Sequence, residues 1–269
     1  MTTRADVAPS PGTTPTRARV LARTCRAEWT RLWTVRTTWW FAAAAAVAMV
    51  GLGLVAGSDA AGNPDPPYGE PAWVAPAIAS LPTQFALLGL ALVAVTSEYA
   101  TSAIVPTLQW APRRSTFFAA RVLVVVGTAT GLGALLAVVS GIAAHAMASD
   151  ILVLPVDDGL SVVGTSAFVF AAGCALAVGL GLVLRSTAGA LVAVFLLILL
   201  LPLLLPQFGY RWMTEVAEVL PGTSAVFLLT GESGAESITE TSAVVTMLVW
   251  AAGALTLGWL RLVRDDADR

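Results

Sequence analysis

Residues 162–206 read VVGTSAFVFAAGCALAVGLGLVLRSTAGALVAVFLLILLLPLLLP, and this stretch decides the fold because Arg185 is its only charged residue. A bilayer core about 30 Å thick is crossed by about 20 apolar residues. A single helix over the whole stretch would be about 67 Å long at about 1.5 Å per residue, which is twice the hydrocarbon thickness. We therefore predict two spans, 162–184 and 188–206, joined by a tight hairpin with Arg185 at the turn.

The rest of the chain has the same apolar character. Hydrophobic residues make up 57% of the sequence, charged residues only 12%, and the mean hydropathy is +0.80. Soluble domains carry about 25% charged residues. Four further segments are long and apolar enough to span a bilayer: 39–57, 74–95, 119–145 and 242–260. We predict an all-α polytopic membrane protein with six transmembrane helices, forming one domain over 17–264 after a disordered tail at 1–16 that is rich in Thr, Pro and Ala.

The distribution of arginine predicts the orientation of the chain in the membrane. All fifteen basic residues are arginines, and fourteen of them lie in the termini, in the second connection and the adjoining start of the third span, or in the fourth connection. The fifth connection has only Arg211, and the first and third have none. Because basic residues remain on the cytoplasmic side, we expect both termini and the segment between spans 2 and 3 to be cytoplasmic.

Residues 17–37 have the pattern of an amphipathic helix that precedes the first span. At about 100° per residue, one face carries Leu21, Cys25, Trp29, Leu32 and Val35, and the other carries Arg19, Arg23, Arg26 and Thr30. We predict a helix in the membrane interface, with Trp29, Leu32 and Trp33 at the lipid boundary and arginine near anionic headgroups. The alternative is a basic anchor that only fixes the topology.

Several kinds of chemistry are excluded by the sequence. Without lysine the chain has neither a Walker A loop nor a Schiff-base lysine. Two cysteines and one histidine are too few for a zinc or iron–sulfur site. Cys25 is expected in the cytoplasm and Cys174 in mid-membrane, so no structural disulfide joins them. The centres of the spans carry no charge, which argues against an ion-coupled carrier.

Glycine pairs at GxxxG spacing occur in two predicted spans, at Gly53 and Gly57 and at Gly127 and Gly131. Such pairs let helices approach closely, either within one subunit or between two. Pro82 and Pro202 are expected to kink the second and fifth spans.

Residues 96–124, TSEYATSAIVPTLQWAPRRSTFFAARVLV, resemble the loop between spans 2 and 3 of type 2 (ABC-2) exporter permeases, especially the Arg-rich forms from GC-rich bacteria. The matching positions are Ser97-Glu98-Tyr99, Thr101-Ser102, Leu108, Pro112-Arg113-Arg114 and Ala120-Arg121. Two positions depart from the family pattern, with Ser102 in place of the usual glycine and Arg121 in place of the usual lysine. The second departure keeps the charge.

Two other segments are similar to the same family. Residues 25–40, CRAEWTRLWTVRTTWW, resemble its entry segment, a Glu-Trp-(Lys/Arg)-Leu run followed by Arg-(Ser/Thr)-Thr-Trp. Residues 216–229, VAEVLPGTSAVFLL, resemble the Leu-Pro-x-x-Ala stretch before its last span. Together with the six-span layout, the resemblance covers nearly the whole chain.

The resemblance implies a transport subunit that is not itself an enzyme, in a bacterial cell membrane. Two permeases, as a homodimer or a heterodimer, would form the pore among membrane lipids, and separate cassette ATPases would hold ATP and Mg²⁺. This chain would need no cofactor of its own and no nucleic acid. The resemblance also implies that the loop between spans 2 and 3 couples to the ATPase, and we expect the contacts to come from Glu98, Tyr99, Arg113 and Arg114.

Alternatives remain at each level. The Arg113–Arg114 pair is equally explained by positive-inside topology, and Glu98 by a helix cap or a local pair with arginine. For the whole protein, the alternatives are a non-transporting membrane anchor or assembly protein and a secondary transporter.

Overall fold

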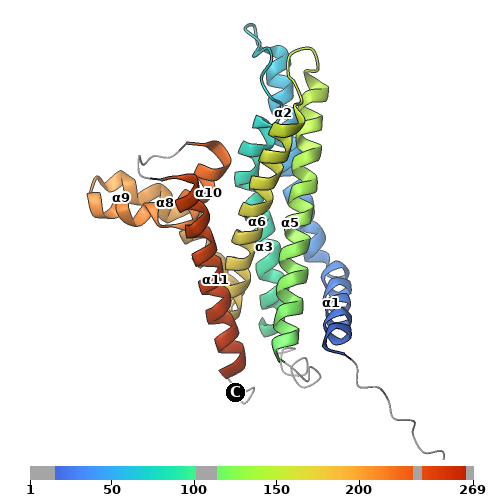
Figure 1. The fold of residues 1–269 in the computed structure, drawn as a ribbon, viewed down its shortest axis with the longest axis vertical. Helices are drawn as coiled ribbons and strands as arrows, with labels where there is room; N and C mark the ends of the chain where they lie inside the picture. Colours follow the sequence, from blue (N-terminus) through green and yellow to red (C-terminus); the bar gives the residue numbers. More distant parts are fainter. Residues whose placement is uncertain (1–15, 101–113, 233–237, 265–269) are drawn as a thin grey trace, which may run out of the picture.

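The computed structural model describes residues 16–100, 114–232 and 238–264, and Figure 1 shows their arrangement. Among them, six helices are long and apolar enough to cross a membrane, as the sequence predicted. They are α2 (Arg36–Gly62), α3 (Val74–Ala100), α5 (Arg114–Met147), α6 (Val156–Leu184), a composite helix from Thr187 to Phe208, and α11 (Glu240–Arg264). The chain is therefore a multi-pass helical membrane protein. Except for Thr16, the predicted disordered tail lies outside the described residues, as does Arg113.

The predicted hairpin between the fourth and fifth spans is confirmed. Helix α6 ends at Leu184, and Arg185 adopts a left-handed conformation with φ 53° while its N–H donates to the Gly181 carbonyl. Ser186 then caps the next helix by accepting a hydrogen bond from the N–H of Gly189 at 3.3 Å. The chain thus reverses within two residues. This reversal was expected because residues 162–206 are too long to cross the bilayer as a single helix.

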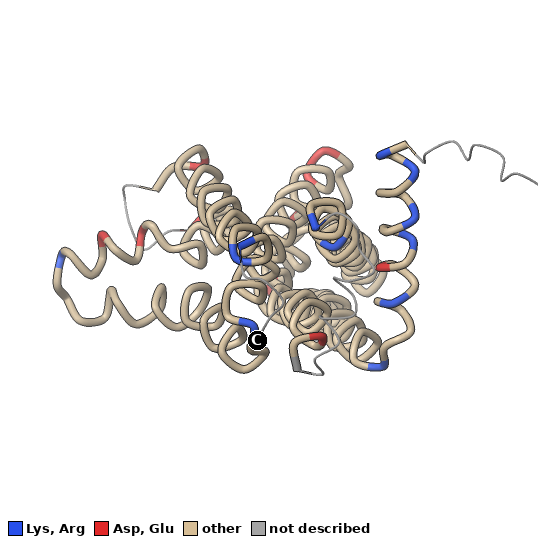
Figure 2. The backbone as a smooth tube through the Cα atoms, turned by 90° about the horizontal axis from the view of Figure 1, so that it is seen from below, with Lys and Arg blue, Asp and Glu red and all other residues tan. Residues whose placement is uncertain are grey.

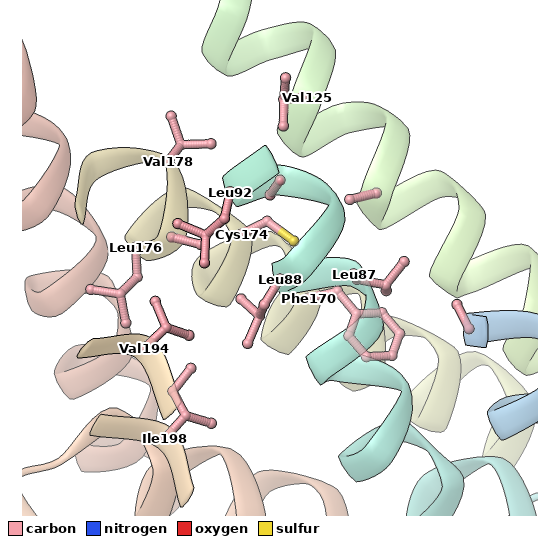
Figure 3. Packing of buried hydrophobic residues seen from close by; sticks show 14 of the residues in the cluster. Leu87, Leu88, Leu92, Val125, Phe170, Cys174, Leu176, Val178, Val194 and Ile198 are labelled. Atoms are coloured by element: carbon pink, nitrogen blue, oxygen red, sulfur yellow. The ribbon is translucent and has the colours of Figure 1, made fainter. Parts of the chain in front are cut away.

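Helices α3 and α6 form the centre of the bundle. In each of them 61% of the most apolar stretch is buried, against 22% in α2 and 28% in α11. Figure 3 shows Leu87 and Leu88 of α3 packed toward Phe170 and Cys174 of α6. Cys174 is completely buried, and both it and Cys25 are free thiols, as expected.

The two GxxxG motifs have different surroundings. Gly53 and Gly57 of α2 are buried against α5, where a Cβ on Gly53 would lie 2.8 Å from the carbonyl oxygen of Ser140. Gly127 and Gly131 of α5 are exposed, and a Cβ at either position would meet nothing within 4 Å. The first motif therefore packs helices within this subunit.

The fifth span is interrupted rather than a uniform helix. It consists of α7 (Thr187–Phe195), a π turn η1 (Leu196–Leu200), α8 (Leu201–Leu204) and a 3₁₀ turn η2 (Leu205–Phe208). The interruption coincides with Pro202, where the sequence predicted a kink, because proline lacks the N–H that would bond to the carbonyl four residues earlier. In Figure 1 this part of the chain turns away from the bundle.

Two short helices follow, where the sequence predicted only a loop. Helix α9 (Arg211–Glu218) lies beside α8 away from the bundle, and α10 (Pro221–Thr230) returns to pack on α11. The N-terminus of α10 meets the π turn so closely that a Cβ on Gly222 would overlap the Ile198 carbonyl. Trp250 of α11 anchors the connection between α9 and α10, because its Nε1 donates a hydrogen bond to the Val219 carbonyl at 2.8 Å.

The first helix and the end of the last one lie at the same end of the bundle. Helix α1 (Arg17–Thr34) packs on the start of α5, and Arg114 at that start donates to the carbonyls of Leu262 and Val263 in α11. Figure 2, seen from this end, shows basic residues along α1 and at the tips of the central helices. The opposite end is closed by the connections at 63–73 and 148–155, where the N–H of Ala72 donates to the Val153 carbonyl.

Candidate functional site: a buried four-charge cluster

Four charged side chains meet at the end of the bundle where α1 packs on α3 and α5. They are Glu28 and Arg31 of α1, Glu98 of α3 and Arg121 of α5, and we call them the four-charge cluster. Two carboxylates face two guanidinium groups, so the cluster is formally neutral. Along the sequence, Glu98 comes three residues before segment 101–113 and Arg121 eight residues after it; the segment itself lies outside the described residues.

Arg121 is the centre of the cluster. Its side chain is 1% exposed, and Nη1 donates to Glu98 Oε2 at 2.8 Å. On the other side, Nε donates to Glu28 Oε2 at 3.1 Å and Nη2 to Glu28 Oε1 at 3.4 Å. The guanidinium also lies over the ring of Phe117, 4.4 Å from its centroid. The planar fork of arginine allows these simultaneous contacts in fixed directions.

Arg31 completes the cluster from the side that faces outward. It bonds to Glu98 Oε1, and its Nη2 donates to the Ala94 carbonyl at 2.8 Å. Burial, together with the positive charge of Arg121, lowers the pKa of Arg31 from its usual value. The two carboxylates oppose that shift, which is why the group tolerates a half-buried site beside a second arginine.

Helix α1 is held in this position by apolar contacts as well. Leu32 is 5% exposed and packs with Leu90 of α3 and Val124 of α5. Thr38 of α2 donates to the Leu32 carbonyl at 2.6 Å. Trp29 is 50% exposed, and Trp33 lies between Trp29 and Trp39. Of the three residues predicted at the lipid boundary, Leu32 therefore contacts protein, while Trp29 lies at the surface.

Three of the four residues predicted to contact an ATPase, Glu98, Tyr99 and Arg114, are described by the structure, and these three do not form one surface patch. Glu98 is 8% exposed and belongs to the four-charge cluster, which confirms the alternative of a local pair with arginine. The ring of Tyr99 lies 5.6 Å from the guanidinium of Arg185. Arg114 reaches the end of α11, and Arg113 lies outside the described residues. Their contact with an ATPase stays a prediction, because it involves a second protein.

Sequence reasoning missed Glu28 as a member of the site. Glu28 is four residues before Leu32 and three after Cys25, so it falls in the middle of the apolar face of α1. An acid inside an apolar stripe needs a buried partner, and this was the available signal. The partner itself, Arg121, is 93 positions away and is identified only by the tertiary structure.

Metal binding has no support in the part of the chain that the structure describes, where no three His, Cys, Asp or Glu side chains gather as metal ligands. Comparison of the chain with protein-family models and with curated proteins gives no match. The fold and the cluster define the class as a multi-pass helical membrane protein with an ionic site between α1, α3 and α5 at one end of its bundle.

Proposed function

We propose that this chain is the permease subunit of an ATP-driven exporter of the ABC-2 type, which forms the membrane path and is driven by a separate cassette ATPase. The observation that supports this most is the four-charge cluster. It joins the N-terminal helix to the two spans that flank segment 101–113, and that segment carries the resemblance to the coupling loop of ABC-2 permeases.

The cluster suggests how force on that segment would reach the membrane. Segment 101–113 leaves α3 three residues after Glu98 and enters α5 eight residues before Arg121. Because Arg121 also binds Glu28, displacement of the segment would move α1, α3 and α5 together rather than bend one helix. The ATPase would shift the equilibrium between inward-facing and outward-facing states by binding one of them more tightly.

The groove between α3 and α7 is our candidate for part of the path. It has a volume of about 500 Å³ and almost entirely apolar walls, which include Phe85, Leu88 and Phe195. Only 17% of the most apolar stretch of the Thr187–Phe208 helix is buried, so a second permease has a large surface on which to pack. Apolar walls of this kind fit an apolar or amphipathic cargo.

Purification of the tagged chain from its native membranes tests this function. We expect a P-loop ATPase in stoichiometric amount and vanadate-sensitive ATP hydrolysis by the purified complex. Arg113→Glu combined with Arg114→Glu should release the ATPase while the permease stays in the membrane, and Arg211→Gln on the exposed helix α9 should have no effect. A chain that purifies without an ATPase points to an anchor, and uptake driven by an ion gradient alone points to a secondary transporter.

A further inference from the structure

Helix α1 has a basic side that faces away from the bundle. Arg19, Arg23 and Arg26 are all exposed. At about 100° per residue, Arg23 lies about 180° around the helix from Leu32, the residue buried against α3 and α5. The four-charge cluster and Leu32 therefore fix the rotation of α1 about its axis, and this rotation directs the three arginines outward. Figure 2 shows the row of basic residues along this helix.

These arginines have no counter-charge within the described part of the chain. None of the three forms an ion pair there, and Glu28, the one acid of α1, is already bound by Arg121 and Arg31. A row of unpaired, outward-facing cations beside a bilayer attracts anions from outside the protein.

The tryptophans place this basic side at the level of lipid headgroups. The ring centroids of Trp29 and Trp33 lie 5.7 Å apart, and those of Trp33 and Trp39 lie 5.0 Å apart. Nε1 of Trp39 also donates to the Trp33 carbonyl at 3.1 Å. This row of tryptophans, whose ring planes are inclined by 60° and 59°, runs from α1 into the first turn of the membrane-spanning helix α2. Tryptophan concentrates at the boundary between headgroups and acyl chains, so α1 lies at that depth.

A cavity of about 450 Å³ opens between the first turns of α1 and α5. Its lining combines Arg17 with the hydroxyl-bearing residues Ser115 and Thr116 and with the apolar side chain of Leu21. No acidic residue occupies the first turn of α5, so the positive end of that helix faces the same region. A guanidinium, hydroxyls and an apolar wall are complementary to a phosphate group attached to an acyl chain.

We propose that α1 is a binding surface for anionic phospholipids, with Arg19, Arg23 and Arg26 as the attracting charges and the cavity beside Arg17 as a headgroup site. The charge complementarity and the row of tryptophans select a lipid surface over a protein partner. This inference goes beyond the proposed function and depends only on the membrane-spanning fold, so it stands or falls independently of transport.

Lipid binding by the purified full-length chain tests the proposal. The delipidated protein in non-ionic detergent is titrated with phosphatidylglycerol or phosphatidylcholine, and bound lipid is counted by native mass spectrometry. We expect a preference of about tenfold or more for phosphatidylglycerol at low ionic strength, falling steeply toward ~1 M salt, where charges are screened beyond about 3 Å. Equal binding of the two lipids overturns the proposal.

Matched variants assign the preference to α1. The triple change Arg19→Gln, Arg23→Gln and Arg26→Gln should bring the binding of the two lipids close to equal, because each arginine near the surface contributes up to about a factor of five. The corresponding triple change to lysine keeps the charges and should retain the preference, which also controls for misfolding. Arg211→Gln removes a 94% exposed arginine from α9 and should change nothing. An unchanged preference in the glutamine variant, or an equal loss in Arg211→Gln, contradicts the proposal.

The headgroup cavity has its own variant. Thr116→Leu fills the cavity and removes a hydroxyl without changing any charge. We expect severalfold weaker phosphatidylglycerol binding, with binding of phosphatidylcholine unchanged. Wild-type affinity in this variant overturns the assignment of the cavity.

Discussion

The carboxylate of Glu98 in α3 lies 2.8 Å from the guanidinium of Arg121 in α5, and both side chains are almost completely buried. The two residues are 23 positions apart, and segment 101–113 lies between them. The pair therefore fixes the separation of the two helices from which this segment departs. Because Arg121 also binds Glu28, the N-terminal helix is tied to the same point.

Removal of one member of this cluster should destabilise the protein strongly. Within the described part of the chain, Arg121→Gln leaves the two buried carboxylates with Arg31 as their only cation, and breaking such a pair costs about 3–5 kcal/mol. Unfolding in mixed micelles of non-ionic detergent and sodium dodecyl sulfate measures the loss.

The double variant Glu98→Gln with Arg121→Gln should lose less than the sum of the two single variants, because one acid and one base, Glu28 and Arg31, then remain 3.6 Å apart and balance each other. Arg211→Gln breaks the exposed Arg211–Glu215 pair, whose side chains are 94% and 61% exposed, and should cost about 0–1 kcal/mol. Equal losses for the buried and the exposed arginine would contradict this account of the cluster.

The two GxxxG motifs should respond differently to alanine. Gly53→Ala places a Cβ 2.8 Å from the backbone oxygen of Ser140 and forces α2 away from α5, at a cost of about 1–3 kcal/mol. Gly127→Ala meets nothing within 4 Å and should be neutral or slightly stabilising, since alanine favours the helix. Thermal unfolding of the monomeric subunit in detergent compares the two, and a destabilising Gly127→Ala would contradict the open surroundings of Gly127 in the single subunit.

The contact between α10 and the interrupted fifth span should also be weakened by a glycine-to-alanine change. A Cβ on Gly222 would overlap the backbone of Ile198 in the π turn, so Gly222→Ala must separate α10 from that turn. We expect faster proteolysis within 205–220 together with a lower unfolding temperature. Gly253→Ala in α11, where a Cβ has open space, is the control and should behave as the wild type.

The membrane orientation predicted from the arginine distribution can be tested with single cysteines. In a variant with Cys25 and Cys174 replaced by alanine, Asp65→Cys and Glu232→Cys should react with a membrane-impermeant maleimide in intact cells. Arg23→Cys should react only after the membrane is opened, because the positive-inside rule predicts that the arginine-rich side is cytoplasmic. All three positions are exposed, so access and not burial decides the outcome. Labelling of Arg23→Cys in intact cells would show that the chain has the opposite orientation in the membrane.

The sequence predicted the spans well because each of them is a local property. Helix formation in a bilayer requires only an apolar run of sufficient length, since each backbone group bonds within its own helix. The hairpin at Arg185 followed from the same length argument. The fifth connection was predicted poorly. Helices α9 and α10 are too short to give a spanning signal, and α10 depends on contacts with the π turn and with α11.

The site was predicted only in part. Glu98 was selected from a motif, but its burial and both of its arginine partners depend on how α1 and α5 pack against α3. The apolar face of α1 was found by periodicity, which does not distinguish a face that contacts lipid from one that contacts protein. Leu32 contacts protein and Trp29 is exposed, although both lie on that face.

By itself, the sequence determined a six-span membrane protein, the excess of arginine in alternate connections, and the hairpin in the longest apolar stretch. Apolar length and charge distribution act on each segment separately, and this is why they can be read without the fold. Only the tertiary structure decided which GxxxG motif packs within the subunit, where the fifth span is interrupted, and that Glu28, Arg31, Glu98 and Arg121 form one cluster. Those features arise from contacts between helices far apart in the chain, and the burial that forces charges to pair exists only after the helices have assembled.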